Sequence, residues 1–288
     1  MRSLAPLLAA VLAGCAAEPR SVDTTPRLWT PAAIASADYE TTPTFSPDGR
    51  EMYFFRGDPT FSTYRLFSSR CEGGRWGAPQ PVPFAATAPA VDSDPALTPD
   101  GRRLYFISTR HAPGGEDFDI WYVDRDRDGW GPPQRLPAPV NSPQSELLPR
   151  VDGEGRLYFG SSRPGGHGQG DIYMAVERDG HWQVSNVGPP VSTAAFEYEA
   201  EISRDGRTMI VVADRGDRSH LYRFEHDGTA WVERGRIAAR DDVFQVGPLL
   251  SPDARRLLFG QAYTDRSGEM FLTDLAPDPD ESWPPDCR

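Results

Sequence analysis

The sequence predicts an all-β protein that forms a single β-propeller of five four-stranded blades. The first observation is a repeated phrase, in which one apolar strand position recurs at Met52, Leu104, Leu157, Met209 and Leu257. These positions are 52, 53, 52 and 48 residues apart, and a nearly constant period of this size is typical of propellers and solenoids. The second observation is composition, because 29 Pro and 27 Gly in 288 residues favour frequent turns over long helices.

Charge and composition limit the classes of function. Hydrophobic residues make up 38% of the chain and aromatic residues 11%, which is enough for a packed core. The net charge is -12, all 30 basic residues are Arg, and no basic stripe is present. Because affinity for nucleic acid comes mainly from clustered cations, we expect no nucleic-acid partner. We also expect a monomer that uses no cofactor.

The first residues are predicted to be a targeting segment, with residues 1–14 a signal peptide and residues 15–27 a lipidated tether. The apolar run from Leu4 to Leu12 is too short to span a membrane as a mature helix. The ending Leu12-Ala13-Gly14-Cys15 resembles the lipobox of bacterial lipoproteins, which are cleaved before the Cys and acylated on it. Ala16 in the next position implies the outer membrane, with the protein facing the periplasm. The alternative is an ordinary secretory signal with a chance Cys.

Two cysteines remain if Cys15 is lipidated, namely Cys71 and Cys287. An even pair in an exported protein suggests a disulfide bond. If the repeats close into a ring, the last blade lies beside the first, and the C-terminal tail comes near Cys71. We therefore hypothesise that a Cys71–Cys287 bond attaches the tail to the first blade. Two free thiols are the alternative.

Each repeat is divided into four strands by its turn residues. The first strand ends at a turn such as Ser46-Pro47-Asp48-Gly49, where Pro presets φ and Asp-Gly tolerates a positive φ. The second strand is an apolar run such as Met52-Tyr53-Phe54-Phe55, which is typical of a strand buried between two sheets. The third strand has an aromatic residue at a fixed position. In four repeats a Trp follows nine residues later, at the start of the fourth strand.

The fifth repeat lacks a fourth strand of its own. It reaches Phe271 and then continues into Ala276-Pro277-Asp278-Pro279-Asp280. Near the start of the chain, Leu28-Trp29-Thr30-Pro31 resembles the fourth strand at Arg75-Trp76, and it is predicted to complete the last blade and hide two sheet edges. Trp283 is the rival candidate for this strand. The prediction is therefore five blades, with six as the alternative.

The third repeat carries a family resemblance. The phrase Ser162-Arg163-Pro164-Gly165-Gly166-His167-Gly168-Gln169-Gly170-Asp171-Ile172-Tyr173, followed by Trp182 and Gly188-Pro189-Pro190-Val191, resembles the TolB-type, WD-repeat-like β-propeller family, especially its version in bacterial envelope lipoproteins. The resemblance extends over about residues 28–275, within a predicted propeller domain at 28–288. It implies an envelope binding or scaffold protein, although propellers also host enzymes.

Acidic residues recur at one position, three residues before the Pro of the first strand or its equivalent. The position is occupied by Glu40, Asp92, Glu146, Glu197 and, in the fifth repeat, Gln245. One hypothesis is that these side chains ring the mouth of the central channel and bind a cation, a ligand or a partner, since like charges in one place recruit a cation or raise each other's pKa. The other hypothesis is a network inside each blade, formed with Arg110, Arg163 and Arg215 and completed by Asp119 and Asp171.

The run Asp124-Arg125-Asp126-Arg127-Asp128-Gly129 begins like a calcium loop. An EF-hand needs a bidentate Glu at the twelfth position, which here is Arg135. The run also coincides with a turn that the other repeats share, so we interpret it as a charged turn. The five His residues show no zinc-ligand spacing, and no metal site is predicted.

Two functional classes remain. The favoured hypothesis is a non-catalytic envelope lipoprotein whose propeller binds a protein or glycan partner, and it expects no isolated deep pair of acids. The alternative is a five-bladed propeller glycoside hydrolase, which needs two carboxylates about 5–10 Å apart. A catalytic set should break the repeat symmetry, and the extra acids Glu199 and Glu201 are the only such break.

Overall fold

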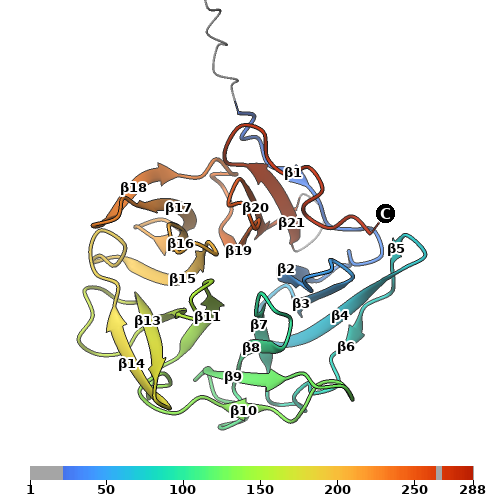
Figure 1. Cartoon of the computed structure of the whole chain (residues 1–288), viewed down its shortest axis with the longest axis horizontal. Coiled ribbons are helices and arrows are strands. Elements are labelled where there is room, and N and C mark those ends of the chain that lie inside the picture. The colour runs from blue at the N-terminus through green and yellow to red at the C-terminus, as the bar shows by residue number, and fades with distance from the viewer. Residues whose placement is uncertain (1–21, 264–267, 288) are drawn as a thin grey trace, which may run out of the picture.

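Five antiparallel sheets are arranged in a ring around a central axis (Figure 1). The computed structural model describes residues 22–263 and 268–287. Blade 1 comprises β2 (Tyr39–Phe45), β3 (Glu51–Gly57), β4 (Tyr64–Glu72) and β5 (Arg75–Trp76), and β6 (Gln80–Pro81) also pairs with β4. Blade 2 comprises β7 (Asp92–Leu97), β8 (Arg103–Ser108), β9 (Asp119–Asp124) and β10 (Gln134–Arg135). Blade 3 comprises β11 (Glu146–Val151), β12 (Leu157–Ser161), β13 (Asp171–Arg178) and β14 (His181–Asn186).

The last two blades complete the ring. Blade 4 comprises β15 (Phe196–Ile202), β16 (Thr208–Asp214), β17 (Ser219–His226) and β18 (Trp231–Arg236). Blade 5 comprises β19 (Gln245–Leu250), β20 (Arg256–Gln261), β21 (Glu269–Asp274) and, from the start of the chain, β1 (Arg27–Leu28). The five-bladed all-β propeller is confirmed, and the six-bladed alternative is wrong. In the described part of the chain, no helix is long and apolar enough to span a bilayer.

The second strand of each blade supplies the core between neighbouring blades. In β3, Phe54 belongs to a cluster with Met270 of blade 5, whereas the next residue, Phe55, belongs to a cluster with Phe106 of blade 2. Successive residues of a strand point to opposite faces, so an apolar run places hydrophobic side chains on both. Each fully buried side chain of this size contributes about 1.5–3 kcal/mol to folding. The apolar runs therefore predicted correctly that these strands lie between two sheets.

The N-terminal segment closes the ring, as predicted. Strand β1 pairs antiparallel with β21, with Leu28 opposite Phe271, and the Trp29 amide donates to the Met270 carbonyl at 2.9 Å. Contact with blade 5 already begins at Thr24, whose carbonyl accepts from the Thr273 hydroxyl at 2.8 Å. Residues 1–21 lie outside the described residues, and with them the predicted signal peptide and Cys15.

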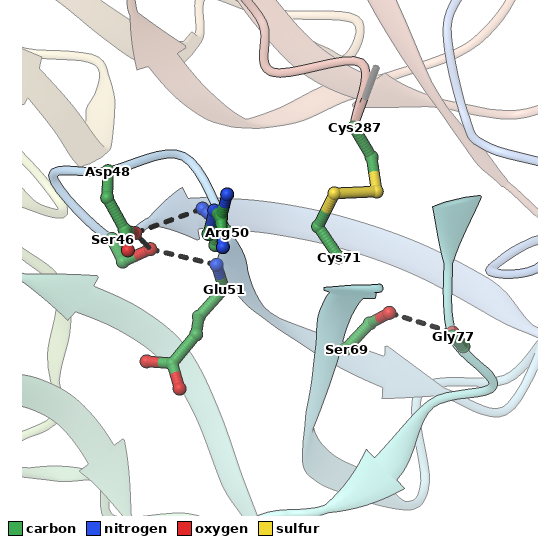
Figure 2. The surroundings of a disulfide bond; sticks show 8 residues. All are labelled: Ser46, Asp48, Arg50, Glu51, Ser69, Cys71, Gly77 and Cys287. Atoms are coloured by element: carbon green, nitrogen blue, oxygen red, sulfur yellow. Dashed lines mark hydrogen bonds between the residues drawn. A yellow bond between two sulfur atoms is a disulfide. The ribbon is translucent and has the colours of Figure 1, made fainter. Parts of the chain in front are cut away.

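The C-terminal tail returns to blade 1 and is bonded to it. Trp283 lies in no strand, and it packs edge-on against Phe45 with ring centroids 6.4 Å apart. Cys287 is joined to Cys71 of β4 by a disulfide bond, with Cα atoms 5.4 Å apart (Figure 2). The bond connects residues 216 positions apart, so it restricts the unfolded chain strongly. The ring is thus joined twice, by β1 and by the tail.

Candidate functional site

The recurrent acidic position lies at the start of the innermost strands, buried inside each blade. Its five residues, Glu40, Asp92, Glu146, Glu197 and Gln245, are each 2% exposed or less. The four carboxylates accept a backbone N–H from the turn before their strand, as Glu197 does from Thr193 at 3.0 Å. Burial raises the pKa of Glu40 and that of Glu146. These side chains hold the connection from the preceding blade to the first strand of their own blade, and they do not form an open ring.

Arginine side chains extend this bonding in three blades. Arg110 and Arg163, both predicted, have Nη2 at 2.8 Å from the acid of their own blade. In blade 1 the equivalent partner is Arg56, whose Nε lies 2.7 Å from Glu40 Oε1. Arg56 was not predicted, because it stands two residues earlier in its strand than the aligned arginines of the other repeats. The guanidinium reaches the same carboxylate from a different backbone position.

Blade 4 departs from this pattern. Arg215 does not bond Glu197; it pairs with Glu233 at 2.8 Å, and its guanidinium stacks on Tyr222, 3.7 Å from the ring centroid. The predicted completion of the network by Asp119 and Asp171 is also different in the structure. Asp119 binds Arg135 at 2.6 Å, and Asp171 accepts the His167 amide, which shapes the glycine-rich loop.

In blade 5 an amide replaces the carboxylate. Gln245 Nε2 donates to the carbonyls of Arg240 and Val243, both at 2.8 Å, and its Oε1 lies 2.6 Å from His220 Nδ1. A neutral side chain thus makes the same strand-to-turn connection. In every blade this position thus connects the first strand to the turn before it.

A second set of side chains, two residues further along each inner strand, faces the central channel. Each inner strand has a β-bulge here, and the channel-facing residues are Thr42, Asp94, Leu148, Glu199 and Gly247. Four of them have a positive φ, which is 53° at Asp94 and 60° at Gly247. A bulge turns a side chain away from the regular alternation of a strand. It thereby brings two acids, Asp94 of blade 2 and Glu199 of blade 4, into one layer although their blades are not neighbours.

These two acids are anchored by other blades. Asp94 Oδ2 accepts the Leu148 amide of blade 3 at 3.2 Å, and Glu199 Oε2 accepts the Gly247 amide of blade 5 at 2.8 Å. Burial raises the pKa of Asp94 to about 6 and that of Glu199 to about 8, where the charge of Asp94 adds to the effect of burial. Perturbed carboxyls of this kind are typical of functional sites.

The next layer of the channel holds an ion pair. Arg150 Nε lies 2.6 Å from Glu201 Oε2, and the guanidinium also donates to the carbonyls of Pro95, Pro149 and Pro248. Burial raises the pKa of Glu201 to about 7 despite this partner. Beyond the pair, a cavity of about 170 Å³ opens among the turns that join the first and second strands. Arg150 therefore connects the inner strands of blades 2, 3, 4 and 5.

Aromatic side chains surround the other mouth of the channel, and we call this group the aromatic rim. It consists of Tyr39, Phe61, Tyr64, Phe118 and Phe244, from blades 5, 1 and 2. Tyr39 stacks on Phe244 with ring centroids 5.8 Å apart, and Phe61 lies 4.9 Å from Tyr39. All except Tyr39 are half-buried, so part of each ring faces solvent.

The run that resembles a calcium loop is a turn. Asp124 ends β9 and binds Arg103 at 2.6 Å, while Asp126 and Gly129 close the turn through a backbone hydrogen bond of 3.0 Å. Its carboxylates therefore serve the hairpin. Among residues 22–263 and 268–287, no group of three or more His, Cys, Asp and Glu side chains is placed to hold a metal.

The repeat pattern of the sequence identifies Glu199 and Glu201 as a break in symmetry, but it does not identify Asp94 and Arg150. A signal for Asp94 was present, because the position two residues after the recurrent acid reads Thr, Asp, Leu, Glu and Gly in the five repeats. That position cannot be recognised as channel-facing without the bulge. Regular alternation would give positions 92 and 94 the same direction.

Known structures share this architecture. TolB from Acinetobacter baumannii has a TM-score of 0.55 and 16% identity, with 85% of this chain and 56% of that chain covered. Putative TolB from Agrobacterium tumefaciens has a TM-score of 0.52 and 18% identity, with 83% and 78% covered. The fold is TolB-like. Zg3597, a family 117 glycoside hydrolase from Zobellia galactanivorans, has a TM-score of 0.56 and 12% identity, with 90% and 92% covered.

The likeness to these structures is one of fold. This chain spans 56% of the length of Acinetobacter baumannii TolB. A scan against protein-family models and a search of curated proteins both find no match. Since a propeller can bind or catalyse, function has to be argued from the site.

Proposed function

We propose that the protein is an exported lipoprotein of the bacterial envelope whose TolB-like propeller binds a protein or glycan partner at the aromatic rim, without catalysing a reaction. Cys15 would carry the lipid anchor, in the outer membrane and facing the periplasm. The observation that supports binding is the rim itself, in which neighbouring rings from three blades lie 4.9–6.1 Å apart and all except Tyr39 are half-buried. Aromatic side chains are enriched where proteins bind partners, because they combine large apolar area with low conformational entropy.

Affinity capture from the native envelope, with crosslinking, tests this proposal. The lipidated wild type is compared with a double variant, Phe61→Ala and Phe244→Ala, and with the matched control Tyr122→Ala on β9. We expect a specific partner with the wild type and the control, and its loss with the rim variant. If the folded rim variant captured the partner as well as the wild type does, the partner would not bind at the rim. In parallel, Cys15→Ser is expected to release the protein from the membrane fraction.

A second candidate function is glycoside hydrolysis, and one observation favours it. Asp94 and Glu199 form the isolated deep acid pair that the binding hypothesis did not expect, and their pKa values are raised to different extents. Two carboxyl groups in such environments can act as general acid and as base or nucleophile. Purified protein would be incubated with a panel of polysaccharides. Cleavage that Glu199→Gln abolishes would establish this function and end the non-catalytic proposal.

A further inference from the structure

We infer that the channel layer containing Asp94 and Glu199 is a binding site for a positively charged organic group, an alkylammonium or a guanidinium, supplied by the ligand. This inference deepens the proposed function, because it assigns a chemical class to whatever enters through the aromatic rim. It is argued from three features of the layer: its charge, its unused hydroxyl groups and its aromatic surroundings.

The two carboxyl groups of the layer have no directly bonded cation. Among the described residues, neither Asp94 nor Glu199 has an ion-pair partner, and the nearest cation, Arg150, is bonded to Glu201 in the next layer. Buried charges in proteins are ordinarily paired. Asp94 accepts a hydrogen bond from the Leu148 amide and a long one of 3.5 Å from the Thr42 hydroxyl, and Glu199 accepts one from the Gly247 amide. A cation is the component that this pair of acids lacks.

Two buried hydroxyl groups beside the acids have no hydrogen-bond partner among the described residues. They are the hydroxyls of Tyr39, which is 2% exposed, and of Thr41, which is 0% exposed. The Tyr39 hydroxyl is within electrostatic reach of Glu199, whose charge acts on it. Thr41 Oγ1 adjoins Gly247, the residue whose amide binds Glu199: a Cβ built on Gly247 would meet it at 2.6 Å. An orphaned buried hydroxyl is costly, so both hydroxyls can take up a ligand group that makes hydrogen bonds, including one that donates them.

The Tyr39 ring is held in place by glycines of blade 5. A Cβ on Gly268 would lie 2.3 Å from the ring, and a Cβ on Gly260 would lie 2.2 Å from Thr41 Oγ1. Any side chain at either position would displace the two hydroxyl-bearing residues. The orphaned hydroxyls are therefore fixed by close backbone packing.

The layer is largely enclosed, and the aromatic rim beside it suits a cation. Asp94 is only 5% exposed and Glu199 only 8% exposed. Two tyrosines of the rim lie close to these acids, because the charge of Asp94 acts on Tyr64 and that of Glu199 acts on Tyr39. Ring faces attract ammonium and guanidinium groups, and two carboxylates with two hydroxyls accept the N–H bonds of one such group. The carbon atoms of an organic cation would contact the rings.

Titration calorimetry and NMR with small probes test the site directly. The probes share a butyl group: butylammonium, butylguanidinium, the neutral butanol and the anionic butyrate, with Ca²⁺ as a separate arm. At pH 8 we expect both organic cations to bind in the millimolar range and the other probes not to bind. A pentapeptide with one central Lys then distinguishes a free amine from a side chain presented by a protein. Binding of the peptide would point to a protein partner, and exclusion of it to a small molecule.

Variants assign the binding to the layer. Asp94→Asn and Glu199→Gln are each expected to weaken it about tenfold. Tyr39→Phe keeps the ring and removes only the hydroxyl, and it should weaken binding of the organic cations about threefold. This variant still tests the site if the acid variants misfold. Glu233→Gln makes the same charge change on the outer strand β18 and should have no effect. Equal affinity in all variants, equal binding of butanol, preferential binding of Ca²⁺ or no binding by the wild type would overturn the inference.

Proton release provides an independent readout. Glu199 is surrounded by Asp94, Arg150, Tyr39 and Tyr198, and burial raises its pKa to about 8, so that it holds its proton at pH 7. A bound cation favours the ionised carboxylate, so binding at pH 7 should release about one proton, visible as a dependence of the heat on the buffer. The probes require no natural partner. If partner capture fails but the probes bind, the cation site is still supported. If the probes fail to bind, only the cation site is contradicted, and binding at the rim is still tested by partner capture.

Discussion

Two sets of buried acids, only two residues apart in the sequence, have opposite surroundings. In blade 2, Asp92 is bonded to Arg110 of its own blade and to Ala86 in the turn that leads into its own strand. Asp94 has no cationic partner among the described residues and is held by an amide of the neighbouring blade. Glu197 and Glu199 of blade 4 repeat the contrast, with the Thr193 turn on one and Gly247 of blade 5 on the other. Burial alone therefore does not distinguish a structural acid from a candidate functional one; the number and origin of its partners do.

The contrast also explains which position repeats. The acid at the start of the inner strand bonds the turn that leads into its own blade, so every blade needs it or an equivalent such as Gln245. The side chains at the channel-facing position come together from all five blades, so the residue required in one blade depends on the other four. Repetition thus marks the structural set, and asymmetry marks the channel.

The largest expected effect comes from breaking the structural set. Glu146→Ala would remove one acceptor from the Arg163 guanidinium and from the Ser142 and Ser161 hydroxyls, and with it the only carboxylate that the Arg163 side chain bonds among the described residues. We expect the free energy of unfolding to fall by about 3 kcal/mol, measured by urea denaturation, because a buried charge and two hydroxyls lose this acceptor. Glu154→Ala, at an exposed turn position, is the control. A loss as small as in this control would mean that the in-blade bonds do not stabilise the blade.

A smaller effect of opposite sign is expected for the channel set. The folded-state pKa of Glu199, about 8, is above its ordinary value of 4.5. Between these pH values the unfolded chain binds fewer protons, so the stability of the wild type falls as the pH rises. Glu199→Gln removes this penalty and should be about 2 kcal/mol more stable than wild type at pH 8, with no advantage below pH 4.5. Urea denaturation at several pH values measures this; an equal loss of stability at all of them would refute it.

The smallest effect sharpens the comparison within the structural set. Arg215 pairs with Glu233, and their side chains are 28% and 34% exposed. Arg215→Ala should cost only about 0.5 kcal/mol, since pairs in contact with water contribute little. Arg163→Ala, in the equivalent place of blade 3, should cost several times more, and the two thermal midpoints can be compared in one experiment. Equal losses would show that the difference in partners has no energetic consequence.

The sequence by itself determined the architecture, because the features that specify a blade are local and recur. The turn residues, the apolar second strands and the fourth-strand Trp predicted five blades, and the missing strand of the fifth repeat pointed to Leu28 at the other end of the chain. The recurrent acid and two of its arginines could be aligned by spacing alone. Arg56 could not, because its guanidinium reaches Glu40 from a different position.

Only the tertiary structure decided which acids face the channel. Each inner strand has a bulge of one residue, and in blade 2 this bulge turns the side chain at position 94 away from the direction of the one at position 92. The alternation of apolar and polar residues in the sequence does not predict this bulge. The pairing of Asp94 with Glu199, on blades that are not neighbours, follows from closure of the ring. Local patterns specify each blade, whereas the channel exists only once all five blades have met.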